Sequence, residues 1–328
     1  MAVARTWRQQ PPPDGPYRIQ DSDIPLLNAV FSDAFTDRYR KDGMAGVRVP
    51  YLNPSVWRFA IADARDGAML WRDDRGNIAA FNVTHLSGAE GWMGPLAVHP
   101  DFQSHGLGKT IVNTGIEWLK RQNARVIGLE TMPRTMDNIG FYSSLGMLPG
   151  YLTLTVTLEA AYASPTTQSR VVRVGTILPA DIDPILDLCR DLSGSLLTGY
   201  DFTREIRLTE ELSLGDTLVL MRNEEVRGFA VAHSVPLVEG RVREELRVLK
   251  LVAREDEDFD CLVTVLADHA RRSGTRRVAL RMQGQYSEAY RRLIARGARV
   301  RWTDLRMSAE GYVEKRPERG IVLSNWEI

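Results

Sequence analysis

The residues that could do chemistry begin in a glycine-punctuated loop between a short apolar strand and a helix. Gln103, Gly106 and Gly108 stand in this loop, after the strand at 96–98, and an apolar face at helical spacing begins at Leu107. Glycine lets a backbone approach a ligand closely, and the N–H groups of a helix N-terminus attract negative charge. The loop therefore predicts a pyrophosphate cradle, although the same pattern also occurs in an ordinary tight strand-to-helix turn.

A second pattern follows the loop and narrows its meaning. A predicted strand at 125–131 leads into Asn138-Ile-Gly-Phe-Tyr142-Ser-Ser-Leu-Gly146-Met. Together, the Gln-x-x-Gly-x-Gly loop and this run resemble the coenzyme A signature and the Asn…Phe-Tyr…Leu-Gly-Phe run of the GNAT superfamily of acyltransferases, with Met147 in place of the usual aromatic residue. The resemblance covers about half of the chain and implies acetyl-CoA as the cosubstrate.

The resemblance also implies roles for particular residues. The N–H of Leu96 would polarise the thioester carbonyl, because the family breaks strand pairing there; Gly94-Pro95 is consistent with such a break, since proline offers no ladder donor. Val98 would hold the pantetheine arm as an extra strand. No metal site is predicted. The predicted cofactor-binding residues are Leu96, Val98, Gln103, Ser104, His105, Gly106, Leu107, Gly108, Lys109, Asn138 and Tyr142.

Tyr142 is the predicted general acid. A phenol with an ordinary pKa of about 10 is no strong acid, but its O–H can stabilise a thiolate as it leaves. Asn138 lies one helical turn earlier on the same face and would bond the pantetheine amide. Taken alone, the pair fits a core aromatic residue and a helix cap equally well. With the loop upstream, the functional interpretation is favoured.

The predicted base is Glu90. Relatives often carry a glutamate eleven residues before the loop glutamine, and Trp92 stands at that position in this chain. Glu90 lies two residues earlier, so its side chain is expected on the same face of the strand. Glu130, His85 and His99 are weaker candidates. A chain of waters, or an amine that arrives neutral, would need no side-chain base.

The sequence leaves the acceptor open. A helix is predicted from Asp23 to about Arg40 and a loop at 41–54. Asp33, Asp37 and Tyr39 and this loop lie where relatives bind acceptors; the two acids could receive a cationic amine, although a solvated helix face explains them as well. Trp57 and Trp92 could line an apolar wall or fill the core.

Composition indicates an ordinary globular protein long enough for two domains. Of 328 residues, 44% are hydrophobic and 26% charged; Lys+Arg and Asp+Glu are 42 each, so no overall charge favours nucleic acid or a membrane surface. No apolar run approaches the roughly 20 residues that a membrane span needs. Cys189 and Cys261 lie in apolar helical runs and are predicted to be buried thiols, which fits a cytoplasmic location.

The second half of the chain repeats the first. Val226-Arg-Gly-Phe-Ala-Val-Ala-His233 echoes Ile78-Ala-Ala-Phe-Asn-Val-Thr-His85, and the element order is the same. We therefore predict an α/β fold of two tandem GNAT-like domains, each a mixed, mostly antiparallel twisted sheet flanked by helices. The predicted divisions are a flexible arm at 1–16, a catalytic domain with the acetyl-CoA site at 17–160, a linker at 161–170 and a degenerate domain at 171–328.

The chemistry is not repeated with the fold. In place of the glycine loop, the second half has four consecutive acids at 255–258, which suit a helix N-terminus but repel phosphate. Ala289 and Leu293 stand opposite Asn138 and Tyr142. One coenzyme A per chain is therefore predicted, bound in the first half. The C-terminal Ile321, Leu323 and Trp326 are expected to complete a sheet or reach the other domain.

The first hypothesis is an enzyme that moves an acetyl group from acetyl-CoA to a primary amine of a small molecule by direct attack. The alternatives are a non-catalytic acyl-CoA-binding or sensing protein and an acetyltransferase for a protein amine. Tyr142 and Asn138 favour an enzyme, because a pure binder needs no phenol. The tandem also resembles mycothiol synthases, in which the second half is the working one. No nucleic-acid or membrane partner is predicted, and a homodimer is left open.

Overall fold

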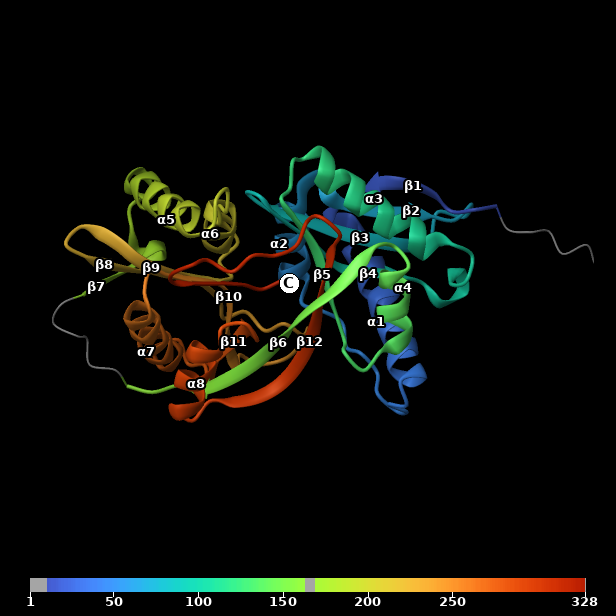
Figure 1. Ribbon diagram of the computed structural model, residues 1–328. Coiled ribbons are helices and arrows are strands. Elements are labelled where there is room, and N and C mark those ends of the chain that lie inside the picture. The colour runs from blue at the N-terminus through green and yellow to red at the C-terminus, as the bar shows by residue number, and fades with distance from the viewer. Residues whose placement is uncertain (1–10, 163–168, 328) are drawn as a thin grey trace, which may run out of the picture.

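The computed structural model describes residues 11–162 and 169–327. Most of the predicted flexible arm and linker lies outside this range. Two lobes lie side by side, joined through the middle by two long strands (Figure 1). In the described part of the chain all thirteen strands form one continuous sheet. The prediction of an α/β fold with a mixed, mostly antiparallel sheet flanked by helices is confirmed.

The first half supplies six strands and four helices. Its strands are β1 (Asp14–Arg18), β2 (Ala68–Arg72), β3 (Ile78–Ser87), β4 (Glu90–Val98), β5 (Val126–Thr131) and β6 (Met147–Glu159). Its helices are α1 (Ile24–Lys41), α2 (Pro54–Ala64), α3 (Leu107–Arg121) and α4 (Met136–Ser143).

The second half repeats this order and adds a terminal strand. Its strands are β7 (Arg170–Arg173), β8 (Gly215–Arg222), β9 (Glu225–His233), β10 (Glu245–Ala253), β11 (Arg277–Gln283), β12 (Arg299–Ala309) and β13 (Ile321–Ser324). Its helices are α5 (Ile182–Leu196), α6 (Thr203–Glu211), α7 (Asp256–Arg272) and α8 (Ser287–Ala295).

Helix α3 shows why these elements form where they do. Its buried residues, which include Ile111 and Leu119, fall on one face at helical spacing. Gly115 on that face lets the helix lie directly on the sheet, because a Cβ there would be 2.6 Å from both Asn82 Nδ2 and Met93 Sδ. The helix that follows the loop is therefore fixed against β3 and β4, which holds the loop in place.

Helix α2 was missed by sequence reasoning. Pro54 stands in its first turn, and the N-cap residue Asn53 accepts a hydrogen bond from the Ser55 N–H at 3.0 Å. Most of its residues are buried, so it lacks the polar face that makes an amphipathic pattern visible.

The two halves exchange their last long strands. β6 of the first half pairs with β11 of the second over 153–159 and 277–283. β12 of the second half pairs with β5 of the first over 305–308 and 128–131. Because β6 and β12 also pair with each other, the order through the middle of the sheet is β5-β12-β6-β11. Each lobe therefore contains a strand from the other half.

Helices cover both faces of the sheet. In the first half, α1 and α2 pack on one face and α3 and α4 on the other. In the second half, α5 and α6 pack on one face and α7 and α8 on the other. One core cluster holds α1 and α2 together with α5 and α6, so it crosses from one half into the other.

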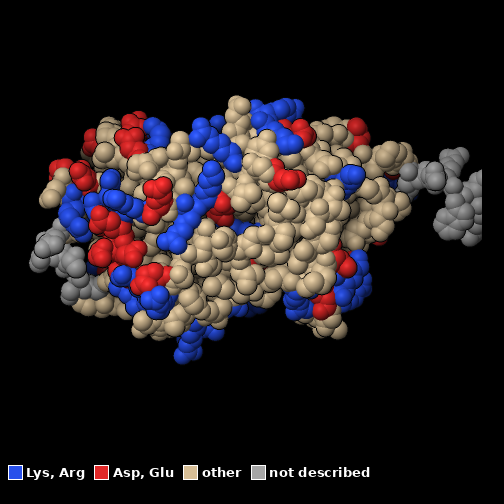
Figure 2. Space-filling view, in the orientation of Figure 1, with Lys and Arg blue, Asp and Glu red and all other residues tan. Residues whose placement is uncertain are grey.

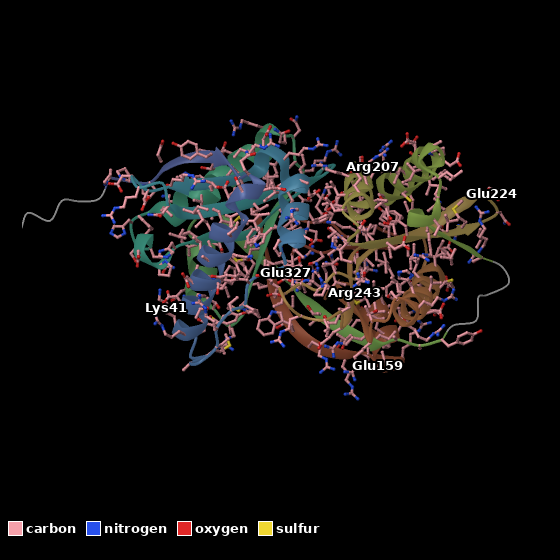
Figure 3. The ribbon with its side chains drawn as sticks, turned by 180° about the vertical axis from the view of Figure 1, so that it is seen from behind. Lys41, Glu159, Arg207, Glu224, Arg243 and Glu327 are labelled. Atoms are coloured by element: carbon pink, nitrogen blue, oxygen red, sulfur yellow. The ribbon has the colours of Figure 1, made fainter. Side chains whose placement is uncertain are left out.

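The end of the chain ties the lobes together, as predicted. β13 pairs antiparallel with β10, and the Trp326 side chain then crosses to the first half, where its Nε1 donates to Glu90 Oε1 at 2.9 Å. Gly128 of β5 makes room for the indole, since a Cβ there would be 2.4 Å from it. Seen from behind, Glu327 lies between the two lobes (Figure 3).

Charge and burial agree with most of the compositional expectations. Basic and acidic side chains intermingle over the second lobe on the face shown in Figure 2. Cys189 is buried, whereas Cys261 is half-buried; neither forms a disulfide within the described residues, and burial raises the pKa of the Cys189 thiol. None of the helices within 11–162 and 169–327 has the length and apolar character that a bilayer crossing requires.

Candidate functional site

Two neighbouring strands of the first half separate and open the sheet. β4 and β5 run parallel and pair over 90–93 and 126–129. Beyond Met93, β4 next pairs with β3 at 96–98, and the register of that pairing shifts between Asn82 and Thr84, opposite Gly94-Pro95. β5 meanwhile continues beside β12. The predicted break at Gly94-Pro95 thus lies where the two parallel strands diverge.

The glycine loop enters α3 in a conformation that requires glycine. Gly106 is the N-cap residue and has φ +83°, and Ser104 has φ +66°. A Cβ at Gly108 would be 3.3 Å from the Phe141 ring, so this glycine also keeps α3 close to α4. The first-turn N–H groups of a helix have no intrahelical acceptor, which lets this end bind an anion.

Two side chains organise the loop. Gln103 Nε2 donates to the Val98 carbonyl at 3.1 Å, and Lys41 Nζ of α1 donates to Gln103 Oε1 at 2.9 Å. The Val98 carbonyl therefore already accepts one hydrogen bond and has a second lone pair for another. Lys41 was not predicted as a site residue. It stands 62 residues before Gln103, so no local pattern could reveal the contact.

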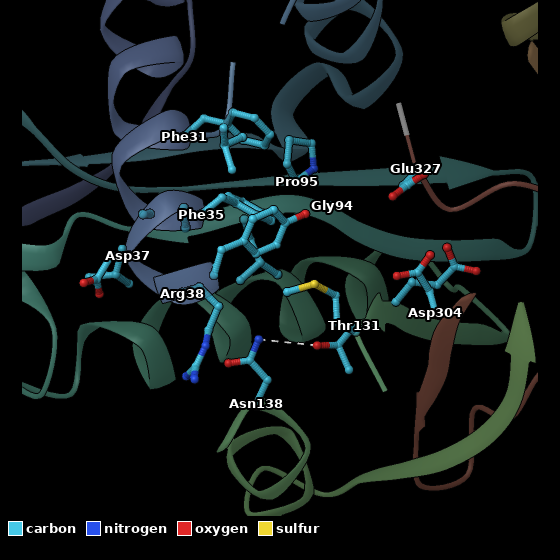
Figure 4. Close-up of a pocket in the computed structure, with 18 of the residues that line it drawn as sticks. Phe31, Phe35, Asp37, Arg38, Gly94, Pro95, Thr131, Asn138, Asp304 and Glu327 are labelled. Carbon is cyan, nitrogen blue, oxygen red and sulfur yellow. Dashed lines mark hydrogen bonds between the residues drawn. The ribbon is translucent and has the colours of Figure 1, made fainter. Parts of the chain in front are cut away.

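Tyr142 and Asn138 both line one cavity, as α4 places them one turn apart. Tyr142 is 7% exposed, and burial raises the pKa of its phenol to about 12. Within the described residues its hydroxyl makes no hydrogen bond. Asn138 Nδ2 donates to Thr131 Oγ1 at 3.4 Å (Figure 4). A neutral phenol facing the cavity can donate a hydrogen bond to a developing anion.

The cavity has a volume of about 700 Å³ and is built from both halves. From the first half it takes α1, the diverging part of β4, the loop, the end of β5 and α4. From the second half it takes the loop after β9, β12 and the C-terminal segment. Among its lining residues are Leu96, Val98, Gln103, Ser104, Gly108, Glu130, Asn138, Tyr142, Leu237, Val238, Trp302, Asp304, Trp326 and Glu327.

Not every predicted cofactor residue lines this cavity. His105, Gly106, Leu107 and Lys109 lie in the loop and the first turn of α3 but are not among the lining residues. Leu107 is buried in the core. The loop backbone can still reach a ligand that extends past the mouth of the cavity.

The structure does not bring the predicted base into the cavity. Glu90 is fully buried at the paired end of β4 and does not line it. Its carboxylate accepts hydrogen bonds from Ser324 Oγ at 2.6 Å and Trp326 Nε1 at 2.9 Å, and Lys250 Nζ lies 3.8 Å away. The alternation of side chains along β4 predicted the face on which Glu90 lies, but it could not predict that the C-terminal segment covers that face. The assignment of Glu90 as the base is therefore wrong in this structure.

Only some of the residues predicted to contact the acceptor line the cavity. Asp37 and Tyr39 line the cavity, whereas Asp33 does not and pairs with Arg48 at 2.8 Å. Trp57 and Trp92 are both buried in the core, so neither forms a cavity wall.

His85 and His99, two of the weaker candidate bases, are not among the residues that line the cavity. His85 is buried and stacked on Trp92, with Nδ1 2.5 Å from Asp63 Oδ2 and Nε2 3.1 Å from the Gly94 carbonyl. Since a carbonyl accepts and cannot donate, Nε2 carries a proton there, and His85 supports the point where β4 diverges. His99 lies 4.0 Å from Asp33, outside the lining.

Three carboxylates, those of Glu130, Asp304 and Glu327, lie at the end of the cavity that the second half helps to form. Sequence reasoning did not predict this grouping. Burial alone would raise the pKa of Glu130, but Arg281 and Arg306 lower it to about 2. Asp304 Oδ2 accepts from Arg281 Nη2 at 2.9 Å, and Glu327 Oε2 lies 2.8 Å from Nη1 of the same arginine. Burial, and then the charge of Glu327, raise the pKa of Asp304 to about 7 against the influence of Arg281.

The comparisons with known proteins agree on the first half and the overall fold. Residues 29–147 match the model of the acetyltransferase (GNAT) family. The chain is 32% identical over 71 residues to the [ribosomal protein bS18]-alanine N-acetyltransferase of Escherichia coli K12, which is 22% of this chain and 48% of that protein. The chain thus spans about half the length of the curated relatives it matches.

Solved structures resemble the whole chain. A GCN5-related N-acetyltransferase from Sphaerobacter thermophilus matches with a TM-score of 0.56 and 14% identity, over 95% of this chain and 98% of that one. A tandem GNAT protein from the clavulanic acid biosynthesis pathway matches with a TM-score of 0.59 and 12% identity, over 92% and 98%. At these identities the likeness establishes the tandem fold.

Proposed function

Because the chain belongs to the GNAT acetyltransferase family through residues 29–147, we propose that it transfers an acetyl group from acetyl-CoA to a primary amine of a small molecule. The observation that carries this proposal is the cavity between the diverging β4 and β5, which has an anion-binding loop at one end and a buried phenol in its wall. Acetyl-CoA would supply the acetyl group as an activated thioester.

The residues present fit this cosubstrate. The N–H groups of Ser104 to Lys109 would hold the pyrophosphate, with Lys41 as a nearby cation. Gly106 leaves the loop surface open, since nothing lies within 4 Å of the position that a Cβ would take. Asn138 would bond an amide of the pantetheine arm, and Val98 would contribute through its N–H and the remaining lone pair of its carbonyl.

The chain's own groups then account for the chemistry. The Leu96 N–H would donate to the carbonyl oxygen as negative charge develops on it. Tyr142 stays neutral at ordinary pH because its pKa is about 12, so its hydroxyl is available as a donor to the departing thiolate. β12 and the C-terminal segment form part of the cavity wall, and the volume of about 700 Å³ leaves room for a small acceptor.

A protein amine is the second candidate, because the relative from Escherichia coli is named for acetylation of a ribosomal protein. The lining residues from the second half favour the small molecule, since they bound the space in which the acceptor would lie. A non-catalytic acyl-CoA binder remains the third candidate.

One experiment separates the three. The purified full chain is incubated with acetyl-CoA and, in separate wells, small primary amines or peptides with free N-termini, and thiol release and acetylated product are measured. We expect release with at least one small amine. Release with peptides alone would favour the protein substrate. Tight coenzyme A binding by calorimetry without release from any acceptor would favour the binder.

A further inference from the structure

The charges at the two ends of the cavity are balanced differently. At the end formed by α1 and the loop, Lys41 bonds Gln103 and pairs with Asp37 at 2.6 Å, and Arg38 pairs with Asp42 at 2.6 Å and with Asp137 at 3.1 Å. At the other end, Asp304 and Glu327 lie together beyond Thr131, away from Arg38 (Figure 4). The phosphates of the cosubstrate would lie at the loop end. The acidic end is lined from the second half and has no part in holding that anion.

The acids at the two ends differ in how far they are neutralised. Burial would raise the pKa of Asp37, but its hydrogen bonds with Lys41 and Arg40 lower it, so its charge is already paired. At the far end Arg281 is shared among Glu130, Asp304 and Glu327.

Other charged groups surround this acidic end. Arg306 adds a second cation but bonds Glu130 at 2.9 Å and also bonds Glu314. The charge of Arg247 acts on Glu327 from β10, and the charges of Glu327 and Asp304 both raise the pKa of Tyr39, after burial. Burial first, and then the charges of Glu327 and Glu130, raise the pKa of Asp304 to about 7 against the influence of Arg281.

A second observation shows that this cavity is built to receive a ligand. Tyr142 is 7% exposed and lines the cavity, yet its hydroxyl has no hydrogen-bond partner within 11–162 and 169–327. Because Tyr142 lines the cavity, a ligand held there can accept the hydrogen bond of this hydroxyl. Trp302 and Trp326 line the cavity near the carboxylates, and Trp302 Nε1 donates to Asp304 Oδ1 at 3.2 Å.

Resting on the proposed function, we propose that Asp304 and Glu327 form the acceptor subsite, that it receives a small primary amine as the ammonium cation, and that Asp304 takes up the proton that this amine must lose. Of these two acids, Asp304 comes from β12 and Glu327 from the C-terminal segment, so the degenerate half completes the site.

The proton and electron balance is simple. The ammonium R–NH₃⁺ gives one proton to the Asp304 carboxylate, which leaves R–NH₂ and a neutral carboxyl group. The nitrogen lone pair forms the new C–N bond, and the C–S bond breaks with its electron pair on sulfur. A second proton from nitrogen ends on sulfur as the thiol forms, and Asp304 returns its proton to water. One proton is released per acetyl group transferred.

Calorimetry tests the binding part directly. The probes are 1,4-diaminobutane, benzylamine and glucosamine, with 1,4-butanediol, benzyl alcohol and glucose as their uncharged counterparts, at pH 8 where Asp304 is ionised. We expect at least one amine to bind the wild type and its uncharged counterpart to bind at least about tenfold more weakly. Asp304→Asn and Glu327→Gln should each weaken the amine by about tenfold or more.

Matched controls separate the possible causes of failure. Asp33→Asn removes an acid from α1 outside the cavity and should change amine affinity less than about twofold. Asp304→Glu should restore part of the affinity. Glu327→Gln keeps the test decisive if Asp304→Asn does not fold, because the Glu327 side chain is 54% exposed. No amine binding, or binding unchanged in both Asp304→Asn and Glu327→Gln, would overturn the subsite.

Coenzyme A affinity and the pH profile complete the design. Normal coenzyme A binding without amine binding would reject the subsite but leave the proposed function intact, whereas no coenzyme A binding would reject the function itself. With an active amine, kcat/KM of the wild type should rise with pH through about 7, since the ionised Asp304 is the active form. If Asp304→Asn keeps that rise, Asp304 is not the proton acceptor.

Discussion

The two halves open their sheets at the same place and use the opening differently. In the first, β4 and β5 pair over four residues each and then diverge around the cavity. In the second, β10 and β11 also pair in parallel over four residues each, at 245–248 and 277–280. There the opening is filled by β13, which pairs with β10 over 250–253 and 321–324.

β13 satisfies groups that a ligand would meet in the first half. The Leu249 carbonyl accepts from the Asn325 N–H at 2.8 Å, and the Tyr286 hydroxyl donates to the Val322 carbonyl at 3.0 Å. Gln283 Nε2 donates to the Ser324 carbonyl at 3.1 Å. The second half therefore binds a strand of its own chain where, under the proposed function, the first binds the pantetheine arm as a strand.

The helix that follows each opening differs as well. α3 begins at Gly106, whereas α7 begins after Glu255 with an acid in each of its next three positions. Three of these four acids pair with cations: Arg227 lies 3.0 Å from Glu255 and 3.1 Å from Asp258, and Arg292 lies 3.6 Å from Asp256. A duplicated fold has thus kept its cavity in one copy and closed it in the other.

The largest effect is expected from a charge in the intact loop. Gly106→Glu should reduce coenzyme A affinity by about 100-fold or more, because a carboxylate would stand where phosphates bind. The φ of +83° adds strain for any side chain, so Gly106→Ala is the control: it carries the strain of about 1–2 kcal/mol without the charge. Calorimetry that finds both variants equal, or both like the wild type, would remove the loop from the cofactor site.

The next largest effect is expected from Tyr142 and its counterpart Leu293, which separate a catalytic role from a packing role. Tyr142→Phe should lower kcat by about 100-fold while coenzyme A affinity is kept, since the ring stays and the hydroxyl is lost. Its counterpart Leu293 is fully buried, so Leu293→Ala should cost about 2–5 kcal/mol of unfolding free energy. Turnover of folded Leu293→Ala should be near that of the wild type. Wild-type kcat in Tyr142→Phe would make Tyr142 a packing residue like Leu293.

A smaller effect tests the corrected base. Glu90 and Glu245 both start the parallel-paired stretch of their strands, but Glu90 is buried beside Lys250, whereas Glu245 forms a half-exposed pair with Arg277 at 2.6 Å. Glu90→Gln should cost about 3 kcal/mol of stability and leave the pH profile of kcat/KM unchanged. Glu245→Gln should cost less than about 1 kcal/mol. A lost acidic limb in Glu90→Gln alone would restore Glu90 as the base.

Local patterns predicted the parts of the site that are local. The helix expected from Asp23 to about Arg40 is α1, and the loop and helix after Val98 form as their glycines and periodicity indicate. Sequence reasoning also recognised the second half as a copy without the glycines. These features depend on residues within one or two helical turns of each other.

The parts of the fold and of the site that sequence reasoning missed depend on contacts between segments far apart in the chain. β6 alternates as a strand should, but nothing in its sequence says that its neighbours are β11 and β12. Glu90 is covered by Trp326, 236 residues later, and Asp304 reaches the cavity through the same exchange of strands. Sequence reasoning placed the acceptor at α1 and the loop at 41–54, and it missed Asp304 and Glu327 because no single segment brings these two together.

The smallest effect is expected from removing charge at the closed opening. Under the sequence argument alone, the acids at the start of α7 exclude a second coenzyme A by repulsion. The structure adds β13 as a physical block. The triple variant Glu255→Gln, Asp256→Asn, Glu257→Gln removes three acids and keeps the buried Asp258.

We expect this variant to bind one equivalent of coenzyme A per chain, like the wild type, because β13 still fills the opening and no glycine frees the helix start. Each lost acid weakens the helix N-terminus by about 0.3–1 kcal/mol, and the Arg227 pair with Glu255 adds little at a site 58% exposed. Calorimetric stoichiometry is the measurement, with the unfolding midpoint as the check on folding. A second equivalent in the triple variant would mean that charge alone separates the two halves, and that β13 yields to a ligand.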